Sequence, residues 1–202
     1  MTAHWNYEDS DLENGPTNWP GESHGSFQSP VDICHDAVEK IQNHDPLKFV
    51  NYNRPIHGDL VNNGHTSEHK PAELHLVHAG VEDPDRLVVL GVFLEVAENH
   101  KPLQIEFDTL VHVTAPNTRR QIANIVLEDK LPKDKSCVRY QGSLTTPPCS
   151  EVVTWMVFTQ PVSITEEQLS ALRQVQDSES GVLQKNRRPV QPLNGRQLFH
   201  VC

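Results

Sequence analysis

The chain has 202 residues, of which 36% are hydrophobic and 22% are charged, a composition that fits one folded, soluble domain of fair size. Seventeen basic residues against 27 acidic ones give a formal net charge of −10, which argues against nucleic acid as a partner because that affinity comes from neutralising phosphates. No apolar run approaches the roughly 20 residues that a membrane-spanning helix needs, and no signal-peptide pattern opens the sequence. These features predict a cytoplasmic protein that binds neither nucleic acid nor membrane, and we expect it to be a monomer.

Short apolar runs separated by turn signals dominate the sequence, which contains 15 prolines and 10 glycines. This pattern indicates many brief strands joined by turns. Residues 5–30 are dense in turn signals and predict an ordered arm along the surface. Six segments have the character of strands, namely 47–52, 56–62, 72–78, 86–96, 109–113 and 152–158. The almost continuously apolar run 87–96 predicts a strand covered on both faces, and therefore a central one.

One helix is predicted after Ile164. Thr165 and Gln168 have the spacing of a capping box, Ile164 and Leu169 that of a hydrophobic staple, and an apolar residue recurs at every third position from Leu169. The helix should lie on an edge or face of the sheet. Residues 187–202 predict an extended tail with a turn. Because no repeat or linker marks a second domain, we expect the whole chain to be a single, predominantly β domain.

The four cysteines, Cys34, Cys137, Cys149 and Cys202, are widely spaced and form no Cys-x-x-Cys pair, which excludes a zinc ribbon or a thioredoxin-type motif. A disulfide between Cys34 and Cys149 fits an oxidising compartment. Free buried thiols fit a chain without an export signal, and this alternative is favoured.

The segment 73–78, Glu-Leu-His-Leu-Val-His, carries the first candidate chemistry. In a strand, alternation places Glu73, His75 and Val77 on one face, with the two leucines and His78 on the other. A carboxylate beside an imidazole is the arrangement that a metal-bound histidine needs, because the carboxylate fixes its tautomer and raises its basicity. Taken alone, however, the pair favours a structural histidine over a metal ligand. A helix would instead bring His75 and His78 together, but the apolar alternation favours the strand.

The segment 142–148, Gly-Ser-Leu-Thr-Thr-Pro-Pro, is more specific. A strand cannot continue through two consecutive prolines, so Thr145 and Thr146 are expected on a rigid loop that presents hydroxyls and a backbone N–H. On the strand that follows, Val153 and Trp155 share one face and predict an apolar wall beside the polar loop, as in small-ligand pockets. An ordinary surface turn is the alternative.

These segments resemble the α-carbonic anhydrases, zinc enzymes that interconvert carbon dioxide and bicarbonate. The matching blocks follow the family's order over nearly the whole chain: 4–7 (HWNY), 14–16 (NGP), 28–33 (QSPVDI), 62–66 (NNGHT), 67–69 (SEH), 71–78 (PAELHLVH), 87–94 (LVVLGVFL), 142–148 (GSLTTPP), 153–155 (VTW) and 188–193 (RPVQPL). The resemblance implies an α+β fold with a central, twisted, mostly antiparallel sheet and few peripheral helices. It also implies zinc as the cofactor, and carbon dioxide and bicarbonate as substrate and product.

The resemblance further assigns roles in catalysis. His75 matches the third zinc-binding histidine, with Glu73 as the carboxylate behind it. His65 matches the histidine that shuttles the proton. Thr145 matches the threonine that orients the zinc-bound hydroxide, and Glu68 matches the buried carboxylate to which that threonine donates its own hydrogen bond.

The remaining matched residues surround the substrate or support the catalytic groups. His69 corresponds to a partner of the buried carboxylate network, and Thr146 lies by the substrate in the family. Five apolar residues match the wall that holds carbon dioxide: Val77, Val89, Leu144, Val153 and Trp155.

The chain departs from the family between Thr66 and Ser67, where the family carries its other two zinc ligands as His-x-His on a strand. No His-x-His occurs in the 202 residues. Without the metal, hydroxide available near neutral pH falls by roughly eight to nine orders of magnitude, so we expect impaired or absent hydration. Recruitment of His65 and His69 beside His75 is the alternative, and it is disfavoured because tetrahedral ligation needs placement that loops seldom provide.

The internal truncation also removes strands from the centre of the expected sheet. Each buried backbone group left unpaired costs about 1–3 kcal/mol. Either the sheet re-registers around the gap, or the chain is the product of a skipped coding segment. The clean motif edges at the junction favour the second explanation.

Two functions are compatible with this sequence. The first is a carbonic anhydrase that has lost two zinc ligands, and the second is a non-catalytic, carbonic-anhydrase-related protein-binding module. The retained threonines, histidine and glutamates favour the former.

Overall fold

The computed structural model describes residues 4–41, 47–62, 72–97, 102–177, 181–182 and 186–201. Strands dominate these ranges, accompanied by two short α-helices and three 3-10 turns, which confirms the predominantly β, α+β fold. The 3-10 turns are η1 (Pro16–Asn18), η2 (His35–Ala37) and η3 (Leu127–Lys130).

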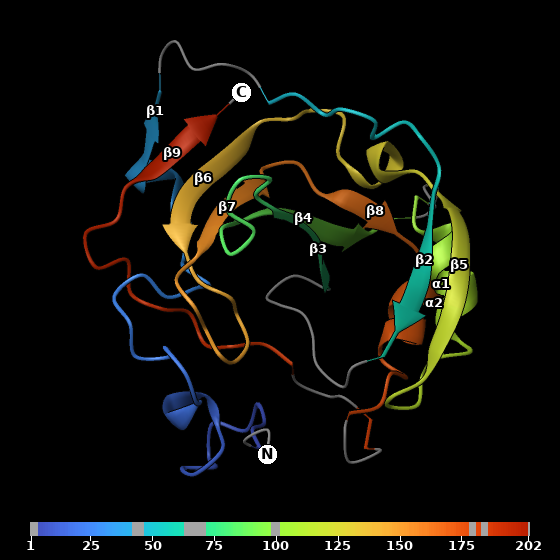
Figure 1. Ribbon diagram of the computed structural model, residues 1–202, viewed down its shortest axis with the longest axis horizontal. Helices are drawn as coiled ribbons and strands as arrows, with labels where there is room; N and C mark the ends of the chain where they lie inside the picture. Colours follow the sequence, from blue (N-terminus) through green and yellow to red (C-terminus); the bar gives the residue numbers. More distant parts are fainter. Residues whose placement is uncertain are drawn as a thin grey trace.

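The main sheet is mixed, and β4 is an interior strand with partners along both of its edges (Figure 1). Its strands follow the order β1 (Val38–Lys40), β9 (Leu198–Val201), β6 (Cys137–Gly142), β7 (Val153–Phe158), β4 (Leu87–Val96) and β3 (Ala72–Ala79), and β8 (Val162–Ile164) also pairs with β4. The pairs β3–β4, β6–β7 and β6–β9 are antiparallel, whereas β1–β9, β4–β7 and β4–β8 are parallel. The central position expected for 87–96 is confirmed, because β4 pairs with three strands.

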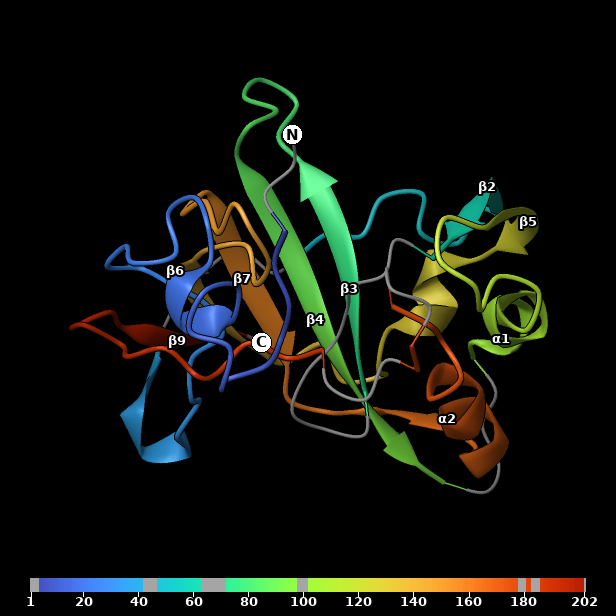
Figure 2. The same ribbon diagram turned by 90° about the horizontal axis from the view of Figure 1, so that it is seen from below.

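A separate two-stranded ribbon lies beyond the β3 edge of the main sheet. It consists of β2 (Ile56–Val61) and β5 (Arg119–Ile125), paired antiparallel. Figures 1 and 2 show this ribbon on the same side of the molecule as helices α1 (Gln104–Leu110) and α2 (Glu166–Leu172). Among the described strands β3 pairs only with β4, so the sheet does not close over to the ribbon.

Both faces of the main sheet are packed, as the apolar sequence of β4 predicts. Leu90, Val92 and Leu94 point to one face, where they join a core that includes residues of α1 and α2. Val89 points to the other face and packs with Trp155 and their neighbours in a second core. Glu73 and Trp155, which the sequence predicts at the site, lie on this second face.

The predicted helix is confirmed as α2. The Thr165 hydroxyl accepts a hydrogen bond from the Gln168 backbone N–H at 3.2 Å, and the Gln168 side chain accepts one from the Thr165 N–H at 3.0 Å, which completes the capping box. Ile164 and Leu169 are buried in the same core, as a hydrophobic staple requires.

Two predicted strands are wrong. Residues 47–52 belong to no strand and lead into a turn, where Asn51 has a positive φ of 65°. Residues 109–113 include the end of α1 and the turn after it, because Leu103, Phe107 and Leu110 recur at helical spacing and all pack against the first core.

The arm before the sheet packs through its aromatic rings. Trp5, Tyr7 and Trp19 lie edge to face with ring centroids 5.1–5.4 Å apart, and buried Cys149 completes the cluster. Cys34, Cys137 and Cys149 are free thiols; Cys137 and Cys149 are buried as expected, but Cys34 is exposed, and Cys202 lies outside the described residues. No helix within the described ranges is long and apolar enough to cross a membrane.

Candidate functional site

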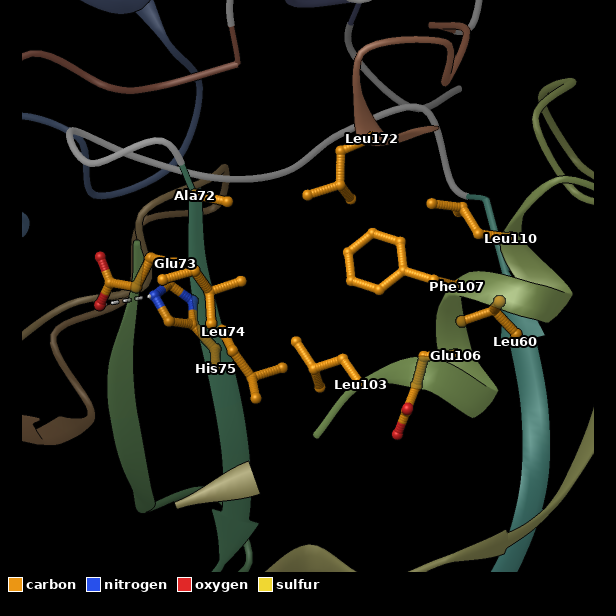
Figure 3. Close-up of a pocket in the computed structure, with 11 residues that line it drawn as sticks. Leu60, Ala72, Glu73, Leu74, His75, Leu103, Glu106, Phe107, Leu110 and Leu172 are labelled. Atoms are coloured by element: carbon orange, nitrogen blue, oxygen red, sulfur yellow. Dashed lines mark ion pairs between the residues drawn. The ribbon is translucent and has the colours of Figure 1, made fainter. Parts of the chain in front are cut away.

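Strand β3 brings Glu73 and His75 together on one face of the sheet. Oε1 of Glu73 lies 3.2 Å from Nε2 of His75 (Figure 3), and their side chains are 5% and 23% exposed. His75 is opposite Gly91 in the β3–β4 register. A Cβ at Gly91 would lie 2.5 Å from Oε1 of Glu73, so a glycine is needed for this carboxylate to lie flat on the sheet.

The other face of β3 holds His78, which packs away from His75. Tyr52 stacks on the His78 ring and its hydroxyl contacts Nε2, while Nδ1 lies 3.3 Å from the Val88 carbonyl oxygen. Burial raises the pKa of the Tyr52 hydroxyl. The strand interpretation of 73–78 is therefore confirmed, and the helical alternative that pairs the two histidines is wrong.

Trp155 forms the floor beside His75. The two rings meet edge to face with centroids 4.9 Å apart, and the indole N–H donates to the Ser143 carbonyl at 3.0 Å. This hydrogen bond links the wall of the site to the start of the threonine loop.

The loop that carries Thr145 and Thr146 connects β6 to β7. Backbone hydrogen bonds from Leu144 to Ser150 and from Cys149 to Thr146 close it. At its start, Ser143 and Ser29 each donate a backbone N–H to the other's hydroxyl, at 2.9 and 3.0 Å. The loop is thus fixed to the N-terminal arm.

Glu73 and Thr145 share a small cavity of about 70 Å³. Its walls come from five segments that are distant in the sequence, and its lining residues are Pro30, Val31, Ile33, Glu73, Phe93, Tyr140, Thr145, Trp155 and Val157. At roughly 30 Å³ per water molecule, this cavity is of a size for very small molecules. No role was assigned to Val31 or Phe93 from the sequence, although they lie within the matched blocks 28–33 and 87–94.

The apolar wall expected from the sequence is only partly gathered. Val89, Val153 and Trp155 are buried in the second core, and Leu144 packs against it. Val77 lies beside Val89 in the strand register, but its side chain is 60% exposed and stands outside that core. Thr146 is half-buried in the loop.

His65, Glu68 and His69 lie outside the described residues. Within the described ranges, no three side chains of His, Cys, Asp or Glu gather in a way that could hold a metal ion. A catalytic zinc site takes three protein ligands. The described side chains therefore supply His75, backed by Glu73, and do not by themselves fit a zinc site of that kind.

A second, larger cavity of about 350 Å³ lies on the outer side of β3, and nothing in the sequence pointed to it. Figure 3 shows Leu74 pointing into it toward Phe107 and Leu103, with Leu172 and Leu110 opposite. Glu73 and His75 also line this cavity, although Figure 3 shows their side chains on the other side of β3 from Leu74.

The domain is built on a mixed sheet, and its β3 carries a histidine and a carboxylate near the loop that holds the two threonines. Sequence comparison identifies the family of this domain. The sequence model described as eukaryotic-type carbonic anhydrase matches residues 14–73 and 66–202. The chain therefore belongs to the eukaryotic-type, or α, carbonic anhydrase family.

Individual relatives match over nearly the whole chain. A Caenorhabditis elegans protein named "Putative carbonic anhydrase 3" is 43% identical, with 100% of this chain and 99% of the relative covered. A second protein of that organism, named "Putative carbonic anhydrase 5", is 31% identical, covering 96% of this chain and 80% of the relative. Carbonic anhydrase 7 of Mus musculus is 30% identical, with 97% of each chain covered.

The lengths of these alignments exceed the length of the chain. The first relative aligns over 247 positions, whereas the chain has 202 residues, a difference of 45. The family match is interrupted at one place, where its two stretches overlap at residues 66–73. That interruption runs into the first residues of β3, which begins at Ala72.

Proposed function

We propose that this chain is a carbonic anhydrase relative that does not itself carry out the zinc-dependent hydration of carbon dioxide to bicarbonate. The observation that carries the proposal is the donor set. Twelve histidines occur in the sequence, none in a His-x-His pair, and within the described ranges the cleft holds His75 with its carboxylate partner Glu73. Zinc lowers the pKa of its bound water from about 15.7 to about 7, and a chain that cannot hold it has no comparable source of hydroxide.

The retained residues support descent from an active enzyme. Glu73 orients His75, Thr145 lies across a small cavity from Glu73, and Trp155 closes the apolar side. A bound zinc would supply the hydroxide in such a cleft. Since the described ligands do not fit that ion, the proposal assigns to these residues the geometry of the site and no catalytic step.

Zinc content and hydration rate test this proposal together. Purified chain is expected to hold far less than one zinc per molecule by elemental analysis. Stopped-flow hydration should not exceed the buffer background. The 43%-identical relative, prepared in the same way, is the positive control for both assays.

One result would overturn the proposal: stoichiometric zinc together with turnover that an aromatic sulfonamide blocks. The variant His75→Ala then locates the activity. If zinc and turnover both disappear in that variant, His75 is a ligand in a site completed by other residues of the chain. If both persist, the zinc is held without His75, and the proposal is overturned in either case.

We propose further that the chain is a cytoplasmic monomer and that nucleic acid is not a partner. The free thiols of Cys34, Cys137 and Cys149 support a reducing compartment, and the net charge of −10 disfavours phosphate backbones. Cell fractionation and sedimentation velocity test these points.

A further inference from the structure

The cavity of about 350 Å³ lies along the outer edge of β3. Four consecutive residues of the strand, Ala72 to His75, all line it. Side chains of a strand alternate between its two faces, so a cavity that touches four in succession must reach around the edge of the strand. β4 pairs with the inner edge, and among the described strands none pairs with the outer edge.

The cavity has a second wall that faces this edge. Leu60 comes from β2, Leu103, Phe107 and Leu110 from the α1 region, and Leu172 from α2. Figure 3 shows these side chains converging opposite Leu74. The space is therefore bounded by an apolar wall on one side and by strand backbone on the other.

The acidic side chains that line the cavity are two glutamates, one of which is paired with a lysine. Glu106 lines it and is paired with Lys130 at 2.8 Å, and Lys130 is itself 4% exposed. Glu73 lines the cavity near the β3 edge, with His75 beside it. An occupant with a negative charge facing β3 would be repelled, whereas neutral, polar or basic side chains are compatible.

The edge borders the place where the relatives have additional chain. The family match is interrupted at residues 66–73, and the 43%-identical relative aligns over 247 positions against 202 residues here. The interruption runs into the first residues of β3, which begins at Ala72. The longer alignment and the position of the interruption together place additional residues of the relatives next to the start of β3 in sequence.

We infer that the outer edge of β3 binds an extended segment of another polypeptide, which adds a strand to the sheet and takes the place of the residues that the relatives carry in cis. The segment pairs its backbone with residues 72–75. On one face it presents apolar side chains to Leu74, Phe107 and Leu172, and on the other it presents neutral, polar or basic side chains toward Glu73. Backbone hydrogen bonds provide affinity and the alternating side chains provide selectivity. This inference does not depend on whether the chain hydrates carbon dioxide.

Peptides provide the direct test. The probes are overlapping synthetic peptides, each about a dozen residues long, that together cover the residues of the 43%-identical relative opposite the interruption. Fluorescence anisotropy with labelled peptides is expected to show saturable binding for one register. A scrambled peptide of the same composition should bind at least about tenfold more weakly. Hydrogen exchange should show new protection of β3 amides.

N-methylation separates strand pairing from general apolar contact without altering the protein. Alternate backbone N–H groups of a strand point to opposite edges. Two isomers of the binding peptide, methylated on even or on odd positions, therefore block one edge each. The isomer methylated toward β3 should lose about tenfold or more in affinity, and the other should lose less.

A variant pair tests the apolar wall. Leu172→Lys places a charge in the cavity and should abolish peptide binding, whereas Val81→Lys, at a position that is 99% exposed in the β3–β4 turn, should not. Thermal unfolding of both variants verifies that they fold. If Leu172→Lys is unfolded, the N-methyl isomers decide the question alone.

Three outcomes would overturn the inference. They are absence of saturable binding by every peptide, equal binding of the scrambled peptide, and equal effects of the two methylated isomers. Concentration-dependent dimerisation, with β3 amides protected in the dimer and no peptide binding, would assign the edge to a second copy of this chain instead.

Discussion

Arg188 is 1% exposed, and its burial links the tail of the chain to the N-terminal arm. Its guanidinium donates to the Gln28 side chain at 2.7 Å and to the carbonyls of Ser29 and Ser23 at 2.9 and 2.8 Å. It also lies 5.6 Å from the Trp19 ring. The planar guanidinium of arginine has several N–H donors in fixed directions, so it can reach these three acceptors at once. The ammonium group of a lysine would match them less well.

Replacing Arg188 by methionine should destabilise the fold strongly. The variant keeps an apolar stem but leaves three buried acceptors without their donor, at about 1–3 kcal/mol each, so we expect a loss of at least about 3 kcal/mol. Urea unfolding followed by tryptophan fluorescence measures the change. The matched control is Arg173→Met, whose guanidinium is 64% exposed and 3.7 Å from Glu166 and should matter by less than about 0.5 kcal/mol. Equal losses in the two variants would show that the buried network contributes little.

Asp11 organises the turns of the arm, and its effect should depend on pH. Backbone N–H groups of Asn14 and Glu13 and the side chain of Asn6 donate to its carboxylate, which holds the pKa of Asp11 well below its usual range. A lowered pKa in the folded state stabilises it above the unfolded value of about 3.9, and this contribution is lost as the pH falls toward the folded pKa. Asp11→Asn should therefore lower the urea midpoint at pH 7, and the difference from the unaltered chain should shrink below about pH 4. A difference that is constant from pH 7 to pH 3 would refute this account.

Helix α2 begins at a capping box that its own residues Thr165 and Gln168 form. Thr165 is 8% exposed and accepts the Gln168 N–H, so Thr165→Ala removes one half of the capping box. We expect a loss of about 1 kcal/mol in the free energy of unfolding, measured by urea denaturation. Thr165→Ser keeps the hydroxyl and serves as the control. A loss of the same size in Thr165→Ser would assign the effect to the methyl group instead of the cap.

The elements that sequence reasoning identified correctly are those whose signal is local. The capping box of α2 lies within four residues, and the apolar run of β4 reflects burial on both faces. β5 was missed because five of its seven residues are exposed, and a strand that is exposed over most of its length carries no apolar alternation. The run 109–113 was misread because the apolar residues Leu110, Val111 and Val113 suit a strand, and only their spacing from Leu103 and Phe107 identifies the end of a helix.

In the site, too, the features with a local sequence signal could be predicted and the others could not. Alternation along β3 predicted that Glu73 and His75 share a face, and the 3.2 Å contact confirms this. The contribution of Phe93, Tyr140 and Val31 to the small cavity depends on how β4, β6 and the arm converge, which no local pattern specifies. The exposure of Val77 has a similar origin, since the neighbours of an edge strand decide whether its side chains are covered.

At the scale of the whole molecule, the main sheet is held together from its centre. β4 pairs with β3, β7 and β8 and contributes to both cores, so these contacts do not require additional strands beyond β3. Packing is least complete on one side, where β3 ends the sheet among the described strands and an apolar cavity of about 350 Å³ separates it from α1 and α2. Apolar surface that faces a cavity contributes less to stability than surface that is packed.

Restoring the missing residues in cis should therefore raise both stability and cooperativity. The change is insertion, between Thr66 and Ser67, of the residues that the 43%-identical relative carries opposite the interruption. The alignment is 45 positions longer than the chain of 202 residues, so the urea m-value should rise by roughly a fifth if the insert folds onto β3, because m scales with the surface exposed on unfolding. The unfolding midpoint should rise as well. A glycine-serine insert of equal length is the control, and it should leave m unchanged while adding only the small entropic cost of a longer loop. If both inserts leave m unchanged, the space beside β3 is not where the relatives' additional residues fold.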